Sequence, residues 1–269
     1  MTSHEKEIAA GQRFQFGDNW ARFLTVLTDE RIRIATESLK AMLEIEYLNG
    51  RSFLDIGSGS GLFSLAARRL GAKVFSFDYD PQSVACTREL KKRYFESDPE
   101  WQIDEGSALD ATYLSELGKF DIVYSWGVLH HTGDMWTALK NVDANVAEDG
   151  RLIIAIYNDQ GLLSRLWIKI KKFYVKNPRA RPALVFLFWP YLVGARFIVR
   201  TIGRKPLDRG MNKYFYMLDW LGGYPFEVAK PETIFEFYFR RGYALNKLKT
   251  CTGKMGCNEF IFRRYLNKY

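Results

Sequence analysis

A group of glycines and acids between residues 54 and 78 has the spacing of a ligand-binding turn. Gly57, Gly59 and Gly61 follow the apolar run FLDI, and Asp78 lies 21 residues after Gly57, at the end of the run KVFSFD. A glycine-rich turn before a helix lets backbone approach a ligand and aims free N–H groups at it. An acid at the end of the next strand can accept hydrogen bonds from both ribose hydroxyls of an adenosyl group. The pattern predicts a site for an adenosine-containing ligand.

The glycine spacing and Asp55 argue against a dinucleotide in this site. The turn reads GxGxG, whereas dinucleotide-binding turns read GxGxxG. Asp55 precedes the first glycine by two residues, where its carboxylate would repel a pyrophosphate but could accept a hydrogen bond from an ammonium group. We therefore expect a cationic ligand.

The elements that must position these residues alternate along the chain from Arg51 onward. The expected strands are residues 52–57, 73–78, 101–106, 120–126 and 151–157. The expected helices between them are residues 61–70, 81–95, 113–117 and 135–146, the last leaving through the turn Glu148-Asp149-Gly150. Such alternation predicts a parallel sheet covered on both faces. A helix at 231–241 and an antiparallel hairpin of strands 244–250 and 258–264 would complete it.

The predicted fold is thus α/β, with a doubly wound, mostly parallel seven-stranded sheet. One or two helices are expected between Gly11 and Leu43, ahead of the sheet. We divide the chain into an N-terminal helical lid, an α/β core, a basic helical insert with a substrate cap, and a last helix with the closing hairpin: residues 1–50, 51–158, 159–230 and 231–269.

The positive charge of the chain is concentrated in the predicted insert. The 269 residues carry a net charge of +8, but residues 161–213 contain thirteen Lys and Arg against the single acid Asp208, which makes that segment +12 and the remainder −4. Within it, residues 161–176 place apolar and basic side chains on separate stripes of a helix. Leu162, Leu166, Ile170 and Phe173 form the apolar stripe, and Arg165, Lys169, Lys172 and Lys176 the basic one. This helix either caps the core with solvated cations, lies on an anionic membrane surface, or cradles an anionic substrate.

Composition places the protein in a reducing compartment. The cysteines are Cys86, Cys251 and Cys257, an odd number without a CxxC motif, so neither a disulfide framework nor a metal site is expected. The first twenty residues lack a secretory signal. The longest charge-free apolar stretch, residues 182–195, is 14 residues long and contains Pro190, whereas a transmembrane helix needs roughly 20. We expect a cytoplasmic protein, with a peripheral position at the inner face of the membrane as an alternative.

Five motifs in order resemble those of the class I methyltransferases that use S-adenosylmethionine. They are LDIGSGSG, FDYDP, DEGSALD, FDIVYSWGVLHHTGD and EDGRLIIAIYN. The resemblance covers about residues 51–158 and the terminal hairpin. The resemblance implies a Rossmann-like methyltransferase fold and S-adenosyl-L-methionine as cofactor. By position it implies that Asp55, Gly57, Ser58 and Gly59 hold the methionine end, Asp78 and Tyr79 the ribose, and Ser107 and Ala108 the adenine, with Trp126 and Gly127 near the sulfonium. Many relatives have an acid where this chain has Ser107.

The acceptor side is indicated by His131 in the loop after the fourth strand. Small-molecule O-methyltransferases of the ubiquinone-biosynthesis type often carry a histidine there, and O-methylation of a hydroxyl needs a general base. We therefore assign His131 as the catalytic base, with a packing role as the competing interpretation. The residues expected to line the acceptor are Trp20, His130, Tyr157, Asn158, Asp219 and Trp220.

The sequence thus predicts methyl transfer to a hydroxyl of a small-molecule, lipid or glycan acceptor. An RNA or protein methyltransferase that uses the insert is the alternative, with nucleic acid less favoured because SWGV stands where an NPPY-like tetrad would mark an amino acceptor. A protein of another class, one that keeps the fold but only binds a membrane or partner, is the third possibility.

Overall fold

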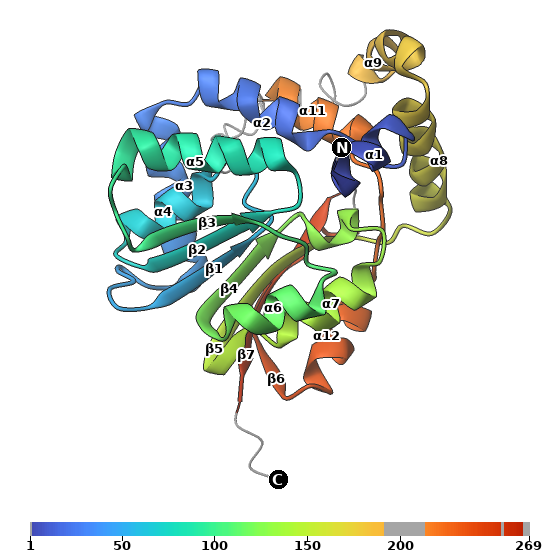
Figure 1. Cartoon of the computed structure of the whole chain (residues 1–269). Helices are drawn as coiled ribbons and strands as arrows, with labels where there is room; N and C mark the ends of the chain where they lie inside the picture. The colour runs from blue at the N-terminus through green and yellow to red at the C-terminus, as the bar shows by residue number, and fades with distance from the viewer. Residues whose placement is uncertain (1, 191–212, 254–255, 266–269) are drawn as a thin grey trace, which may run out of the picture.

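A seven-stranded sheet forms the centre of the computed structural model, which describes residues 2–190, 213–253 and 256–265 (Figure 1). Its strand order is β3-β2-β1-β4-β5-β7-β6. Strand β7 alone runs in the opposite direction, so it pairs antiparallel with β5 and β6. The strands are β1 (Ser52–Ile56), β2 (Lys73–Asp78), β3 (Trp101–Glu105), β4 (Phe120–Trp126), β5 (Val146–Tyr157), β6 (Tyr243–Lys249) and β7 (Cys257–Arg264). The predicted doubly wound, mostly parallel sheet with a closing hairpin is confirmed.

Helices cover both faces of the sheet because successive strand residues point to opposite sides. In β1, Phe53 belongs to one buried cluster and Leu54 to the other. The first cluster lies under α3 (Asp29–Leu43), α4 (Leu62–Arg69) and α5 (Pro81–Phe95), and the second under α6 (Ala111–Leu117), α7 (Met135–Asp143) and α12 (Pro231–Phe239). Both faces of the central strands are therefore buried, whereas much of the edge strands β3 and β6 is exposed.

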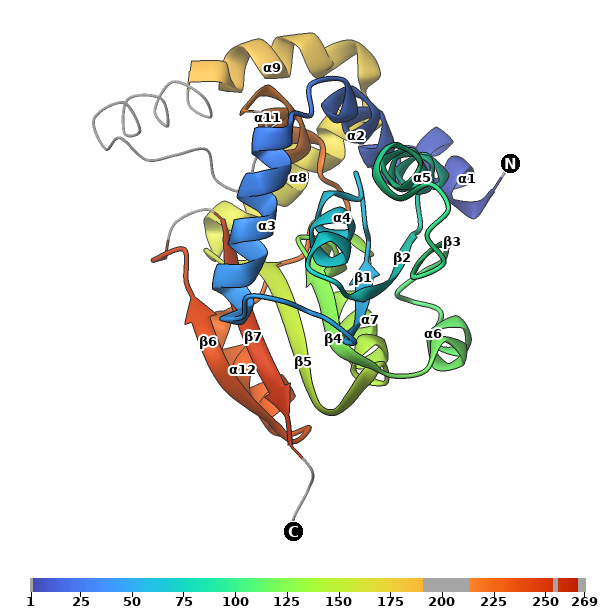
Figure 2. The same cartoon turned by 90° about the vertical axis from the view of Figure 1, so that its left-hand side faces the viewer.

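A third cluster joins the N-terminal helices to the insert at the end of the sheet where the parallel strands finish (Figure 2). The N-terminal helices are α1 (Ser3–Ala9) and α2 (Phe16–Thr25). The insert contributes α8 (Leu162–Lys176), the short η2 (Pro178–Ala180), α9 (Arg181–Trp189) and α11 (Lys213–Gly222). Phe14, Trp167, Tyr174, Trp220 and Phe226 are buried together there. The helical lid and helical insert are thus packed on each other over the strand ends.

The expected exit of α7 at Glu148-Asp149-Gly150 is wrong. Helix α7 already ends at Asp143, and β5 begins at Val146. Val146 pairs with Phe120, but the next pair is Ile122 with Arg151, so the residues between them bulge out of the strand. Asp149 takes a left-handed backbone conformation with φ 58°. The acidic turn is therefore an irregularity inside β5.

Helix α8 presents three of the four residues of its predicted apolar stripe to solvent, while the fourth, Ile170, is partly buried against the third cluster. Leu162, Leu166 and Phe173 are 79%, 52% and 50% exposed. The buried side of the helix consists of Ser164, Trp167, Lys171, Tyr174 and Val175. The basic stripe of Arg165, Lys169, Lys172 and Lys176 is exposed next to the apolar one. Both stripes thus point outward, and Lys171, one of the thirteen cations of the insert, does not face solvent at all.

Candidate active site

Side chains from other segments pack directly against the glycine-rich turn between β1 and α4. Gly57 and Gly59 have φ 75° and 56°, values that favour glycine. A side chain would also collide with its surroundings, since a Cβ on Gly59 would lie 2.9 Å from the Trp20 ring and one on Gly57 would lie 2.3 Å from Val128. Trp20, predicted to line the acceptor, therefore packs on the glycine turn that is predicted to hold the cofactor.

The expectation that the turn aims free N–H groups at a ligand is wrong for its first residues. The N–H groups of Gly57 and Ser58 donate to the carbonyl of Phe77, at 2.8 and 3.0 Å. The N–H of Gly59 donates to the Asp78 carboxylate at 2.9 Å. These bonds tie the turn to the end of β2, and they bring Asp78 beside the glycines.

The carboxylate of Asp78 has more acceptor sites than its hydrogen bonds within the protein use. Its carboxylate accepts from the N–H groups of Gly59 and Asp80, each at 2.9 Å, and an ionised carboxylate has about four acceptor sites. Burial raises the pKa of Asp78 to about 6, against these hydrogen bonds and with the help of the Asp80 charge. A carboxyl held at such a cost, at the end of a strand beside a glycine turn, is typical of a functional site.

Asp55 instead lies in a polar chain inside the domain. It is 2% exposed and accepts from the Ser64 hydroxyl. Ser64 in turn accepts from Ser76 at 2.8 Å, and Ser76 from the Trp101 indole N–H at 2.9 Å. Burial raises the pKa of Asp55 to about 7, while the Ser64 hydrogen bond opposes the shift. These hydrogen bonds between side chains link β1, α4, β2 and β3. That Asp55 also accepts from the ammonium group of a ligand stays a prediction.

The remaining predicted cofactor residues lie on the loops that follow β2, β3 and β4. Tyr79 donates its hydroxyl to Glu7 of α1 at 3.1 Å. The Ser107 hydroxyl accepts from the Leu109 N–H at 3.1 Å, and Ala108 is buried. At Gly127, directly after Trp126 at the end of β4, a Cβ would meet no atom within 4 Å. Space thus exists beside Gly127, where the resemblance expects the sulfonium.

His131 lies in the single turn η1 (Leu129–His131) after β4, and its tautomer follows from its partner. Its Nδ1 lies 2.6 Å from the carbonyl oxygen of Pro225, which can only accept, so Nδ1 carries the proton and Nε2 carries the lone pair. Burial lowers the pKa of His131 to about 3, against the Pro225 hydrogen bond and with the help of the Lys171 and Arg13 cations. The imidazole is neutral at physiological pH.

Aromatic rings surround His131. Its ring centroid lies 5.0 Å from that of Phe16, 5.6 Å from Tyr157 and 6.5 Å from Phe226. Tyr157 also lies 4.2 Å from His130 and 5.2 Å from Trp220. Of the predicted acceptor residues, the structure therefore brings His130, Tyr157 and Trp220 together around His131.

Two predicted acceptor residues with described side chains, Trp20 and Asn158, do not join this group. Trp20 packs on Gly59, as described above. Asn158 accepts from the Asn258 side chain at 3.1 Å, which ties the end of β5 to β7. The side chain of Asp219 lies outside what the structure describes.

Two cations near His131 were not predicted from the sequence. Lys171 is fully buried, donates to the carbonyl of Trp220, and lies 4.7 and 4.6 Å from the ring centroids of Trp220 and Phe226. Arg13 donates to the carbonyls of His131 and Thr132 at 2.7 and 3.1 Å. Both were counted only as part of the net charge, because sequence spacing does not show that they reach a loop 40 to 118 residues away.

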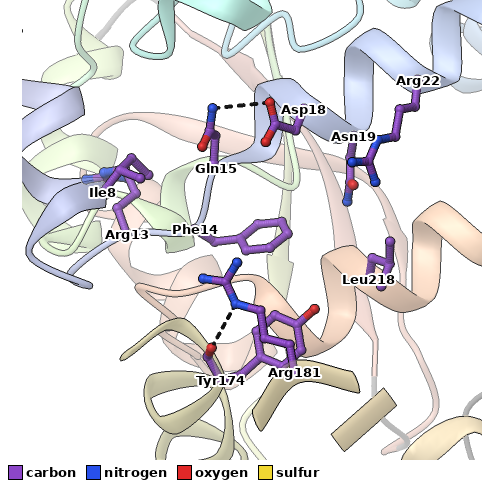
Figure 3. A pocket seen from close by; sticks show the side chains of 10 residues that line it. All are labelled: Ile8, Arg13, Phe14, Gln15, Asp18, Asn19, Arg22, Tyr174, Arg181 and Leu218. Carbon is purple, nitrogen blue, oxygen red and sulfur yellow. Dashed lines mark hydrogen bonds between the residues drawn. The ribbon is translucent and has the colours of Figure 1, made fainter. Parts of the chain in front are cut away.

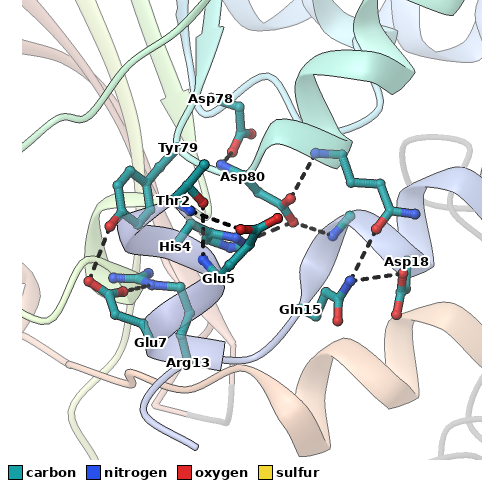
Figure 4. A network of polar contacts seen from close by, with 12 residues as sticks. Thr2, His4, Glu5, Glu7, Arg13, Gln15, Asp18, Asp78, Tyr79 and Asp80 are labelled. Carbon is teal, nitrogen blue, oxygen red and sulfur yellow. Dashed lines mark hydrogen bonds and ion pairs between the residues drawn. The ribbon is translucent and has the colours of Figure 1, made fainter. Parts of the chain in front are cut away.

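A polar network fastens α1 and the start of α2 to the loop after β2 (Figure 4). Glu7 accepts from Arg13 at 2.6 Å and from Tyr79 at 3.1 Å. Asp80 accepts from the Gly17 N–H at 2.7 Å, and the His4 ring lies 3.8 Å from it. Because Arg13 also holds the His131 loop, the lid connects the predicted ribose loop to the predicted acceptor loop.

We expect acid to destabilise the protein partly through His130. Burial lowers its pKa well below the ordinary value, and His131 and Lys171 add to the shift. Below about pH 6.5, His130 is protonated in the unfolded chain but stays neutral in the folded state. The free energy of unfolding therefore decreases by up to about 1.4 kcal/mol for each pH unit below that value. In urea unfolding at pH 7 and pH 5, His130→Phe should lose less stability between the two pH values than the original protein. An equal loss in both would contradict a neutral buried imidazole.

Residues 54–152 match the family described as a methyltransferase domain. The chain is 29% identical over 157 residues to the mitochondrial ubiquinone biosynthesis O-methyltransferase of Schizosaccharomyces pombe, covering 55% of this chain and 52% of that enzyme. It is 33% identical over 110 residues to a tRNA U34 carboxymethyltransferase of Pseudoalteromonas translucida, covering 41% and 33%. The alignments thus span about half or less of these relatives.

Solved structures show the same fold over most of the chain. Magnesium protoporphyrin IX methyltransferase from Synechocystis PCC 6803, with bound S-adenosylhomocysteine, superposes with a TM-score of 0.53 at 16% identity, covering 92% of this chain and 93% of that one. A cyclase superposes with a TM-score of 0.54 at 10% identity, covering 86% and 81%. These superpositions extend over most of this chain and show a shared fold.

Proposed function

We propose that this chain, whose residues 54–152 match a methyltransferase domain, uses S-adenosylmethionine to methylate a hydroxyl oxygen of a small-molecule, lipid or glycan acceptor. The observation that supports a hydroxyl is the state of His131. Its Nδ1 proton is committed to Pro225, so Nε2 offers a lone pair at neutral pH. A hydroxyl loses a proton as its oxygen attacks, and a nitrogen lone pair can take that proton.

In this proposal, different residues of the site bind the cofactor and take the proton from the acceptor. Asp78 accepts from the ribose hydroxyls, and the turn at Gly57 and Gly59 faces the methionine end. When bound, S-adenosylmethionine supplies an electrophilic methyl group. His131 orients the acceptor O–H and takes its proton at Nε2, while the rings of Phe16, Tyr157 and Phe226 exclude water. Positioning supplies much of the rate in such a reaction.

The acceptor class is tested by following a labelled methyl group. Purified protein is incubated with methyl-labelled S-adenosylmethionine and with extracts separated into lipid, small-molecule, RNA and protein pools. Label in the first two pools, sensitive to His131→Ala, supports the proposal. Label confined to RNA or protein would favour the alternative acceptors. Binding of S-adenosylhomocysteine with no label in any pool would favour a non-catalytic protein.

We further propose that the outward side of α8 and α9 lies on an anionic membrane surface. Five bulky apolar side chains of these helices are 50% to 84% exposed: Leu162, Leu166, Phe173, Phe186 and Leu187. The exposed basic stripe of α8 runs beside three of them, and each cation near an anionic bilayer contributes up to about 1 kcal/mol. An interfacial helix needs both features. No helix in the described part of the chain is long and apolar enough to cross a bilayer.

Vesicle co-sedimentation tests this surface with two variants. Vesicles containing phosphatidylglycerol should bind the protein roughly tenfold or more tightly than phosphatidylcholine vesicles, and salt should weaken the difference. The variants are Lys169→Gln/Lys172→Gln/Lys176→Gln and Leu166→Ser/Phe173→Ser. Each should lose roughly tenfold in binding.

The control variant is Phe239→Ser, because Phe239 is 62% exposed on α12, on another side of the molecule. It should bind vesicles normally. If the Leu166→Ser/Phe173→Ser variant also binds normally, the contact is purely electrostatic, as with RNA, and the membrane proposal is wrong.

A further inference from the structure

A pocket of about 190 Å³ opens between the lid and the insert (Figure 3). Its walls come from the lid, α8, α9 and α11. They consist of Ile8, Arg13, Phe14, Gln15, Asp18, Asn19, Arg22, Tyr174, Arg181 and Leu218. Ligand pockets usually measure 300 Å³ or more, so this volume suits one chemical group of a larger molecule.

The pocket lining is positively charged, with three arginines against the single acid Asp18. Arg181 donates to the carbonyls of Tyr174 and Val175, each at 3.2 Å, and carbonyls hold a guanidinium without neutralising it. Across the described residues, neither Arg22 nor Arg181 forms an ion pair with an acid. Arg13 is the one of the three that does, with Glu7 at 2.6 Å. Charge that the protein leaves uncompensated favours an anion in the pocket.

The pocket lies two ring contacts away from His131. Its wall residue Phe14 lies 5.0 Å from Phe16, and Phe16 lies 5.0 Å from the His131 ring, measured between centroids. Arg13 borders the pocket and donates to the His131 carbonyl at 2.7 Å. A molecule that holds its hydroxyl at His131 and another group in the pocket would therefore have to lie along these rings.

We propose that this pocket binds the anionic group, a carboxylate or phosphate, of an acceptor with an aromatic or apolar body. This inference rests on the proposed methyl transfer and narrows its substrate class. Phe14 and Tyr174 provide apolar contact for the body, while Arg22 and Arg181 hold the charge. An arginine fork suits both carboxylate and phosphate oxygens.

Calorimetric titration of the intact protein with benzoate, phenyl phosphate and benzamide tests the site without requiring turnover. Benzamide is close in shape to benzoate but neutral. We expect at least one of the two anions to bind roughly tenfold or more tightly than benzamide. Arg22→Gln and Arg181→Gln should each weaken that anion about five- to tenfold and leave benzamide unchanged; which anion binds better identifies carboxylate or phosphate as the group.

Arg165→Gln is the matched control, since Arg165 is an exposed cation of α8 that does not line the pocket. It should not change anion binding. Arg22 is exposed and has no described side-chain bond, so Arg22→Gln should fold even if Arg181→Gln does not. Equal binding of anions and benzamide, or normal anion binding by Arg22→Gln, would overturn the proposal. The proposal would also be overturned if inorganic phosphate bound as tightly as phenyl phosphate, because the apolar body would then contribute nothing to binding.

The outcome is separable from that of the proposed methyl transfer. Titration with S-adenosylhomocysteine should give the same affinity in the arginine variants as in the original protein. Anion binding can therefore fail while cofactor binding and methyl incorporation persist, and methyl incorporation can fail while the anion still binds.

Discussion

Asp78→Asn should stabilise the cofactor-free protein above pH 6 and weaken its binding of S-adenosylhomocysteine about thirtyfold. The folded state raises the pKa of Asp78 to about 6, so it holds the proton more tightly than the unfolded chain. Stability is therefore lost as pH rises from about 4 to 6, up to about 3 kcal/mol. The asparagine removes this cost. It keeps only one oxygen for the N–H groups of Gly59 and Asp80, so we expect a net gain of about 1 to 2 kcal/mol.

The loss of ligand affinity has a separate cause. A neutral amide accepts from ribose hydroxyls less strongly than a carboxylate, and charge-assisted hydrogen bonds are worth on the order of 2 kcal/mol. Calorimetry with S-adenosylhomocysteine measures the loss of affinity. Thermal unfolding at pH 7.5 and near pH 4 measures the gain in stability. The stabilisation should shrink toward pH 4, where both side chains are neutral.

Asp121→Asn provides a control of opposite sign. Asp121 lies at the other end of the sheet, where it accepts from the N–H and hydroxyl of Ser52 at 2.8 and 2.9 Å and pairs with Arg51 at 3.1 Å. Burial alone would raise the pKa of Asp121, but these partners lower it. Asp121→Asn should destabilise the protein at pH 7.5 and leave cofactor affinity unchanged. If Asp78→Asn behaves in the same way, Asp78 is a structural residue and the cofactor assignment is wrong.

The sheet was predictable from sequence because local pattern and global packing agree in it. The strands at residues 73–78 and 120–126 and the helix at 81–95 have the predicted bounds. Each combines apolar residues of one period with glycine, proline or acidic residues at its ends. The same agreement explains why the glycine turn and Asp78 were found: both lie where a strand of this sheet ends.

The orientation of α8 was not predictable, since its sequence contains two apolar stripes. Leu162, Leu166 and Phe173 form one, and Trp167 and Tyr174 lie on the other with Lys171 between them. The partner decides between them: the rings of Trp220 and Phe226 bury the second stripe and accept the Lys171 ammonium. A buried lysine interrupts a hydrophobic pattern, so periodicity alone could not show which stripe faces the core. Contacts between distant segments, such as Arg13 with the His131 loop, leave no local pattern.

The tautomer of His131 likewise depends on a distant segment, because the Pro225 carbonyl fixes it across 94 residues. Sequence alone could place a histidine after β4 but could not assign which nitrogen carries the proton. Its assignment leads to the sharpest kinetic prediction. His131→Ala should lower turnover roughly a hundredfold or more while S-adenosylhomocysteine affinity stays unchanged.

The pH dependence separates a base from a packing residue at this position. With a pKa lowered to about 3, His131 stays unprotonated throughout pH 5 to 8, so turnover of the original protein should show no acidic limb from this group near pH 6.5. Without the imidazole, only the ionised acceptor can react, so the rate of His131→Ala should rise about tenfold per pH unit until the acceptor hydroxyl titrates. Added imidazole should restore part of the lost rate at neutral pH. A variant whose rate is reduced equally at every pH, and which imidazole does not rescue, would show that His131 only packs the loop between Phe16 and Tyr157.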